Sequence, residues 1–169
     1  WADEYIQHSY ILFEQLLRIW ALELAAKVYK NNNWQEKAAI IKEVVQNNFW
    51  ITPNSKPYLV NLFEKQKEAF NNYWLMGFNP ARVYHYFDLQ ANALALLLQI
   101  GTTEQNQILI QKIKSTFFTN SDSMIPSFYP AITEKDDDMK ELLNNYAYNF
   151  RNKPHQFHNG GLWPVWNGL

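Results

Sequence analysis

Five residues near the end of the chain bring together, in one short stretch, groups that can bind a hydroxylated ligand. They are His158, Asn159, Gly160, Gly161 and Trp163, within the run HNGGLW. Adjacent glycines permit backbone dihedrals and close approaches that other residues do not. Histidine and asparagine can hydrogen-bond hydroxyls, the N–H groups at a helix start are free donors, and a tryptophan ring can stack on a sugar ring. The stretch predicts the floor of a sugar pocket; a tight loop-to-helix turn with a core tryptophan is the alternative.

A second candidate region is the aromatic-rich segment 71–87. Trp74, Tyr84 and Tyr86 could line the mouth of a pocket, and Arg82 could bind hydroxyls or pair with an acid. Aromatic residues make up 17% of the chain, and many stand beside polar groups. Apolar ring faces with polar edges suit sugars, which present C–H faces and hydroxyl rims. Packing in an aromatic-rich helical core is the alternative for each of these rings.

Metal-binding patterns are weak. His155 and His158 are three positions apart, but no neighbouring carboxylate or third histidine completes a site. The run EKDDDMK at 134–140 lacks the spaced carboxylates of a calcium loop and is typical of a solvated helix start. The absence of cysteine excludes thiolate ligands and disulfides. We therefore expect no metal and no cofactor.

The charge pattern narrows the choice of partner. The chain has 15 basic and 16 acidic residues without a long run of either sign, so nucleic acid and anionic membranes are not expected. Its longest apolar stretches, such as ALALLL, are too short to span a bilayer. No signal peptide is visible and residue 1 is tryptophan. We expect a cytoplasmic protein whose true N-terminus precedes residue 1, and the oligomeric state stays open.

The elements that must position these residues are predicted to be helices. One apolar stripe with a step of three or four consists of Ile6, Tyr10, Phe13, Leu17, Trp20, Leu24 and Val28, and Leu12, Leu16 and Ile19 widen it. The break NNN at 31–33 offers Asn33 as the N-cap of a second helix. That helix repeats the period at Trp34, Ala38, Ile41 and Val45. Two helices with a short polar break predict an antiparallel hairpin.

The second half of the chain predicts a buried helix followed by an amphipathic one. Residues 88–100 are apolar nearly all round, with Gly101 as a natural stop. Thr102 and Gln105 have capping-box spacing, and Leu109, Ile113 and Phe117 share one face of the next helix.

The remaining segments predict loops and shorter helices. TPNSKP at 52–57 and NSDSMIPSFYP at 120–130 are expected loops, and residues 58–73 could be helical. EKDDDMKELLNNY and the start between Gly161 and Pro164 predict two further helices. Since no strand alternation persists, we expect an all-α fold with inner helices buried on most sides and outer helices buried on one.

Several of these segments resemble the α/α-toroid glycosidases. They are YHYFDLQANALALLLQIGTTEQNQILIQKI from Tyr84, FYPAI, FHNGGLWPVWNG and, more weakly, WADEYIQHSYILFEQLLRIWAL at the start. The most similar groups are the neutral/alkaline invertases and the amylo-alpha-1,6-glucosidase, or glycogen-debranching, type. The resemblance implies an (α/α)6 barrel, a six-hairpin toroid with long irregular loops at its pocket end. Residues 1–169 would then be one domain, a C-terminal-half fragment of a larger catalytic domain.

The resemblance also implies catalytic residues. Glycoside hydrolysis normally needs two carboxyl groups, which inverting enzymes hold about 6.5–9.5 Å apart. Asp3 matches the general acid of the debranching type, with Trp1 beside it to desolvate it and contact substrate. In invertase-like relatives the acid comes from an earlier segment. The second carboxylate is expected outside this chain, with Asp88 and Glu14 as internal alternatives; N-capping of the buried helix is the other reading of Asp88.

Together these observations predict a glycosidase that hydrolyses an α-glycosidic bond in an oligosaccharide or sucrose-like sugar by an inverting route. The expected substrate-binding residues are Trp1, Trp74, Arg82, Asp88, His158, Asn159, Gly160, Gly161 and Trp163. A toroid that binds carbohydrate without catalysis is the first alternative. A helical-repeat scaffold for protein partners is the second, and a toroid-fold epimerase or isomerase with a histidine pair is the third.

Overall fold

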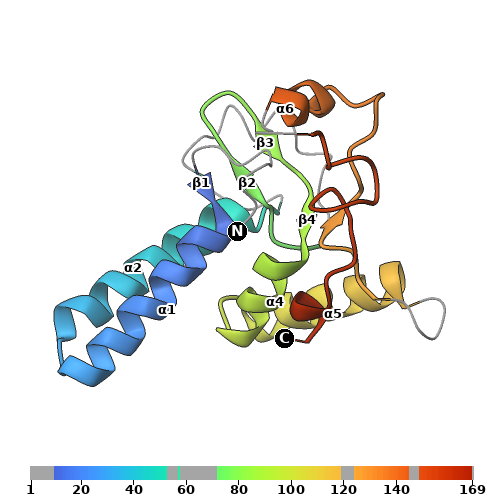
Figure 1. Cartoon of the computed structure of the whole chain (residues 1–169). Helices are drawn as coiled ribbons and strands as arrows, with labels where there is room; N and C mark the ends of the chain where they lie inside the picture. Colours follow the sequence, from blue (N-terminus) through green and yellow to red (C-terminus); the bar gives the residue numbers. More distant parts are fainter. Residues whose placement is uncertain (1–9, 53–56, 58–71, 119–123, 145–148, 169) are drawn as a thin grey trace.

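The computed structural model of the chain describes residues 10–52, 57, 72–118, 124–144 and 149–168. The helices in this part are α1 (Leu12–Tyr29), α2 (Asn32–Phe49), α4 (Leu89–Leu97), α5 (Thr103–Phe117), α6 (Asp138–Asn144) and α7 (Pro164–Asn167) (Figure 1). The strands are β1 (Tyr10–Ile11), β2 (Gly77–Phe78), β3 (Val83–Tyr84), β4 (Phe87–Asp88) and β5 (Phe128–Tyr129). Helix predominates, as expected, but the all-α prediction is wrong in omitting the strands. Each strand has two residues, which is too short to leave an alternating pattern in the sequence.

The antiparallel α1–α2 hairpin is confirmed, and it projects away from the rest of the molecule (Figure 1). Lys30, with φ 51°, turns the chain at the end of α1. The next helix is capped by Asn31, whose side chain accepts a hydrogen bond from the Trp34 N–H at 3.3 Å. The expectation of Asn33 as the cap is wrong, because α2 begins at Asn32.

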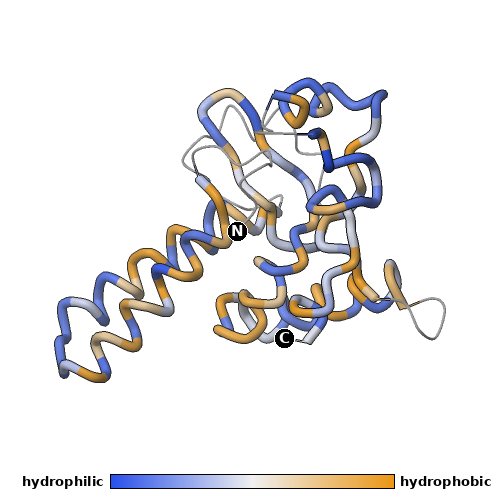
Figure 2. Tube along the Cα trace, viewed as in Figure 1, coloured by the Kyte–Doolittle hydropathy of each residue, from blue (hydrophilic) through white to orange (hydrophobic). Residues whose placement is uncertain are grey.

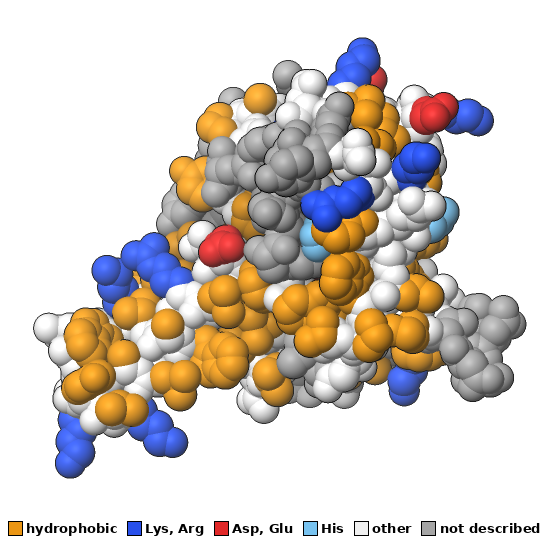
Figure 3. All heavy atoms as spheres, in the orientation of Figure 1, with side chains coloured by type: hydrophobic (Ala, Val, Ile, Leu, Met, Phe, Trp, Pro, Cys, Tyr) orange, Lys and Arg blue, Asp and Glu red, His pale blue; other side chains and the backbone are white. Residues whose placement is uncertain are grey.

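The face that α1 buries differs from the expected stripe. Leu12, Leu16 and Ile19 are completely buried, on the side where α1 packs against α2 and α4. By contrast, Leu17, Trp20, Leu24 and Val28 are 37–70% exposed. Apolar residues therefore run along both sides of α1 (Figure 2), and apolar side chains gather on the surface of the hairpin (Figure 3). Within the described residues, only one of the two apolar sides has packing partners in the core.

A small antiparallel sheet joins the hairpin to the segment 73–84. Its strand order is β1–β2–β3, with Ile11 opposite Gly77 and Gly77 opposite Tyr84. A side chain at Gly77 would place a Cβ 2.7 Å from the Tyr10 carbonyl oxygen, so the close strand approach requires glycine. The Leu12 N–H then donates to the Met76 carbonyl at 2.9 Å, and the sheet continues directly into α1.

Helices α4 and α5 follow the sequence pattern, except at the end of α4. The capping box of Thr102 and Gln105 is confirmed, and Leu109 is the fully buried residue of α5. Helix α4 ends at Leu97, and the chain turns at Gln99 with φ 51°. The expectation of Gly101 as the stop signal is therefore wrong. Gln99, a non-glycine residue in the left-handed region, follows the end of the helix, and the sequence pattern gave no sign of this.

Three segments far apart in the sequence meet beside the start of α4. Strand β4 pairs with β5, the Leu89 N–H donates to the Ser127 carbonyl, and the Ser127 N–H donates to the Gly161 carbonyl at 2.9 Å. The FYPAI and HNGGLW motifs therefore lie side by side. The expected helix start near Pro164 is confirmed, with this proline in the first turn of α7.

The core has two parts. The larger one is formed by α1, α2, α4 and α5 with the aromatic residues of 73–87, and the smaller one lies beneath α6 around Tyr84, Phe128 and Ile132. Among the helices of the described ranges, none combines the length and apolar character needed to cross a bilayer.

Candidate functional site

A polar groove of about 420 Å³ opens between β3, the residues that follow it, and α6. It is lined by Tyr73, Arg82, Val83, His85, Tyr86, Pro130 and Asp138. The volume lies in the range of small-molecule sites. The lining combines aromatic rings, one guanidinium, one imidazole and one carboxylate, which are the groups expected of a site for a hydroxylated ring.

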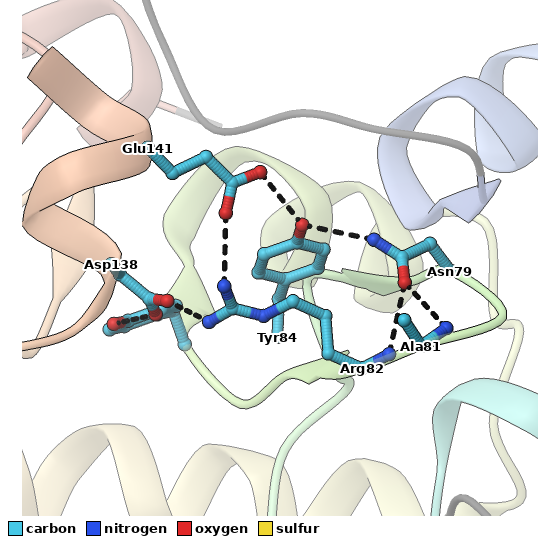
Figure 4. A network of polar contacts seen from close by, with 7 residues as sticks. Asn79, Ala81, Arg82, Tyr84, Asp138 and Glu141 are labelled. Atoms are coloured by element: carbon cyan, nitrogen blue, oxygen red, sulfur yellow. Dashed lines mark hydrogen bonds and ion pairs between the residues drawn. The ribbon is translucent and has the colours of Figure 1, made fainter. Parts of the chain in front are cut away.

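Arg82 is the centre of the charge network at the groove (Figure 4). Its Nη1 donates to Glu141 Oε2 at 3.0 Å, and its Nη2 forms an ion pair with Asp138 Oδ1. Both acids lie in the first turn of α6, which begins at Asp138. The sequence analysis left open whether Arg82 binds hydroxyls or pairs with acids; the structure shows the pairing and leaves the Arg82 side chain 36% exposed beside the groove.

Two tyrosines supply ring faces and hydroxyls. Tyr86 stacks on Phe128 with ring centroids 4.5 Å apart, and its hydroxyl donates to Asp138 Oδ2. Tyr73 donates to the His85 carbonyl oxygen at 2.5 Å. Burial, and then the negative charge of Asp136, raise the pKa of Tyr86 to about 12. Burial also raises the pKa of Tyr73 above its ordinary value, so both hydroxyls are neutral donors at physiological pH.

His85 adds no positive charge to the groove near neutral pH. Burial lowers the pKa of its imidazole below the ordinary value of 6.5. Arg82 is then the cation of the lining, and it faces the carboxylates of Asp138 and Glu141. This balance favours an uncharged ligand, because a phosphate would need positive charge that is not already paired.

The double-glycine turn is held by hydrogen bonds within the protein. Asn159 is fully buried: its Oδ1 accepts from the Ile132 N–H at 2.7 Å, and its Nδ2 donates to the carbonyls of Ile132 and Asn152. Gly160 has φ 86°, and a Cβ on Gly161 would lie 2.3 Å from the Phe157 carbonyl oxygen. Both donors of the Asn159 amide are therefore used within the protein, and the turn-building alternative accounts for Asn159, Gly160 and Gly161.

His158 and Trp163 form a stack over this turn. Their rings are 5.4 Å apart and within 9° of parallel, and Trp163 Nε1 donates to the Phe157 carbonyl at 2.9 Å. His158 is 5% exposed, while Trp163 is half-buried. Neither residue lines the groove, so the structure does not join them with Arg82 in one described cavity.

Asp88 and Trp74, two further expected ligand contacts, are interior residues. Asp88 is 2% exposed and caps α4 by accepting from the Ala91 N–H at 3.1 Å, as its N-capping interpretation predicted. Burial raises the pKa of its carboxyl to about 6. Trp74 has no exposed surface and packs edge-on against Trp50 at 5.0 Å, so core packing holds for Trp74 rather than a place at the mouth.

The remaining expected residues divide into two groups. Asp3 and Trp1 lie outside the described residues, so their roles stay predictions. Glu14 is exposed on α1 and does not line the groove. The sequence analysis missed Asp138, Glu141 and Tyr73. Two of these lie in a segment whose acidic run was interpreted as a solvated helix start, because nothing local shows that an arginine more than fifty positions earlier faces it.

Comparison with known proteins identifies the family. The model of the alkaline and neutral invertase family matches residues 17–167, which is most of the chain and includes the groove, α6 and the HNGGLW turn. No curated protein gives a significant match. The resemblance to the invertase group is confirmed by this match. The chain therefore belongs to the alkaline and neutral invertase family of glycoside hydrolases.

Proposed function

We propose that the protein hydrolyses an α-glycosidic bond in a sucrose-like disaccharide or short oligosaccharide, and that the polar groove binds one of the sugar rings. The observation that carries this proposal is the groove itself, where Arg82, Tyr86 and Asp138 converge in a member of a glycosidase family. Tyr86 offers a ring face, and Arg82 and Asp138 offer a donor and an acceptor for hydroxyls.

The charge of the groove supports a neutral sugar. Asp138 and Glu141 offset the charge of Arg82, and burial keeps His85 uncharged near neutral pH. A sugar that carries hydroxyls alone can exchange hydrogen bonds with such a network without an unpaired charge.

The chemistry in this proposal is inverting hydrolysis by two carboxyl groups. Asp3 is the proposed general acid, and the general base is proposed to lie outside this chain. Asp88 serves the site indirectly, as the cap that fixes β4 to the start of α4. His158, Asn159, Gly160, Gly161 and Trp163 form a rigid turn beside the FYPAI segment, on which the groove residue Pro130 lies.

We also propose that the helices form part of an (α/α)6 barrel. The exposed apolar side of α1, formed by Leu17, Trp20, Leu24 and Val28, supports this proposal. A helix with apolar residues on two sides is expected where neighbouring hairpins cover both.

Hydrolysis of sucrose, maltose, isomaltose and trehalose by the intact enzyme, which includes the segment proposed to carry the general base, tests the function. We expect turnover of at least one of them, with the β-anomer released first when the reaction is followed by proton NMR. Release of the α-anomer first would contradict the inverting route, and absence of turnover on all four with measurable sugar binding would favour the non-catalytic alternative.

Two substitutions test the residues. Arg82→Ala should lower kcat/KM about tenfold or more, because it removes a charged hydrogen-bond donor, whereas Arg18→Ala, on the exposed side of α1, should leave it unchanged.

Asp3→Asn should abolish hydrolysis and leave sugar binding largely intact. Unchanged turnover in Asp3→Asn would remove Asp3 from the mechanism and agree with an acid from an earlier segment.

A further inference from the structure

We propose that Glu141 is a positioning residue for sugar binding, which acts by fixing the orientation of the Arg82 guanidinium. This inference rests on the proposed function, because it takes the groove to be the sugar site. Glu141 is not among the residues that line the groove, yet it holds one end of the arginine that does.

The guanidinium is held at both of its ends. Nη1 donates to Glu141 and Nη2 pairs with Asp138, so the two carboxylates bind separate corners of one planar group (Figure 4). A planar fork anchored at one corner can still rotate about that contact. The second anchor removes this rotation, and Glu141 supplies it.

Glu141 is itself fixed by a buried ring. The Tyr84 hydroxyl donates to Glu141 Oε1 at 3.0 Å, and Tyr84 is 1% exposed. The Arg82 guanidinium carbon lies 4.8 Å from the centroid of the same ring. Arg82, Tyr84 and Glu141 therefore form a closed triangle, and the ring that supports the arginine also sets the position of the carboxylate.

The turn before β3 completes the frame. Asn79 Oδ1 accepts from the N–H groups of Ala81 and Arg82 at 2.8 and 2.9 Å, and Asn79 Nδ2 donates to the Tyr84 hydroxyl at 3.2 Å. Both the backbone and the side chain of Arg82 are thus held. An arginine held in this way loses little rotational freedom when a sugar hydroxyl binds to it.

Asp138 and Glu141 have different roles in this arrangement. Asp138 lines the groove and also accepts from Tyr86, so it is in reach of a ligand. Glu141 reaches the ligand site through Arg82. The loss of Glu141 should therefore weaken sugar binding only as long as Arg82 is present.

A double-mutant cycle tests this dependence. KM and kcat for the disaccharide that the protein hydrolyses are measured for Arg82→Ala, Glu141→Ala and the double variant. The Kd for sucrose is measured by calorimetry for the same three variants in the Asp3→Asn background, where no hydrolysis is expected. We expect Arg82→Ala to raise KM and Kd about tenfold or more, and Glu141→Ala to raise them about three- to fivefold with kcat within about twofold. The double variant should match Arg82→Ala, because coupled residues are not additive.

Control variants separate positioning from folding. Glu141→Gln keeps the shape and the Tyr84 contact, and it should give a smaller rise in KM than Glu141→Ala; it replaces Glu141→Ala in the cycle if that variant does not fold. Glu134→Ala, at an exposed position in the preceding segment, should leave KM unchanged.

The outcomes separate this inference from the proposed function. Unchanged KM and Kd in Arg82→Ala would show that the groove is not the sugar site, which overturns both. A rise in Arg82→Ala with no change in Glu141→Ala would overturn the positioning role and leave the groove assignment in place. A full further loss when Glu141→Ala is added to Arg82→Ala would show that Glu141 does not act through Arg82.

Discussion

The α1–α2 hairpin and the loop region around the groove are stabilised by different kinds of interaction. We define the loop region as the described residues 72–88, 124–132 and 149–163. The hairpin is held by helical hydrogen bonds between residues close in sequence and by an apolar interface at Leu16, Ile19 and Val45. The loop region is held by polar side chains that bind backbone groups far away in sequence, such as Asn159 with Ile132.

The distribution of buried polar residues makes the same distinction. They are Asn48, Asp88, Gln90, Asn92, Ser127, Asp138, Asn152, His158 and Asn159 among the residues that the structure describes. Asn48 is the hairpin member of this set. Where the chain runs as loop, its backbone donors and acceptors need other partners, and buried amides supply them. The groove proposed as the sugar site thus lies where side-chain hydrogen bonds replace secondary structure.

The largest expected effect is that of Asn159→Ala in the loop region. It removes three buried hydrogen bonds and leaves the N–H and carbonyl of Ile132 without this partner. We expect a loss of about 4 kcal/mol in the free energy of unfolding, measured by urea denaturation. A loss below about 1 kcal/mol would show that the amide does not hold the two motifs together.

The next largest loss of stability is expected for Gly161→Ala, with Gly168→Ala as its control. Gly161→Ala would bring a Cβ to 2.3 Å from the Phe157 carbonyl oxygen. Because this oxygen is a backbone atom, the clash can be relieved only if the turn itself shifts. We expect a loss of about 2–3 kcal/mol. Gly168→Ala, where the nearest atoms are 3.7 Å away, is the matched control and should change thermal stability little.

The buried carboxyl of Asp88 should give the loop region a pH dependence. Its pKa is raised from 3.8 to about 6, so the folded state binds the proton more tightly than the unfolded state does. The resulting stabilisation is complete below about pH 4 and is lost as the pH rises through 6. Relative to Asp88→Asn, which keeps the cap, the unfolding free energy of the wild type should fall by on the order of 2 kcal/mol between pH 4 and 7. Parallel pH profiles of the two proteins would contradict this expectation.

The smallest expected effect lies in the hairpin. Asn31→Ala removes the N-cap of α2, a single hydrogen bond at 3.3 Å near the surface. We expect a loss of about 1 kcal/mol, measured as a shift in the thermal midpoint. An effect as large as that of Asn159→Ala would erase the distinction between the two regions.

The same contrast explains which features could be predicted from the sequence. The two helices of the hairpin, the capping box of Thr102 and the N-cap at Asp88 depend on residues within four positions of one another, and local patterns predict them. The choice between the two apolar sides of α1 depends on what packs against each, so Leu16 and Leu24 could not be distinguished from periodicity.

The candidate site was predictable in part for the same reason. Arg82 and Tyr86 stand out in an aromatic segment, and the family resemblance emphasised HNGGLW. Asp138 and Glu141 reach Arg82 across more than fifty positions, and no local pattern encodes that contact. Asn159 looked like a ligand-binding residue because its amide can bind hydroxyls; the fold uses the same donors for its own backbone.

The burial of Asn159 has a chemical consequence for the lifetime of the protein. Asparagine followed by glycine is the dipeptide most prone to deamidation, in which the next backbone nitrogen attacks the side-chain amide and a succinimide forms. In the folded protein the Asn159 amide is clamped between Ile132 and Asn152 and is kept from that attack. Each excursion to the unfolded state removes this protection, and the aspartate or isoaspartate product lacks the two N–H donors that rebuild the turn. Ageing of the unfolded chain at the Asn159–Gly160 bond would therefore make heat inactivation irreversible.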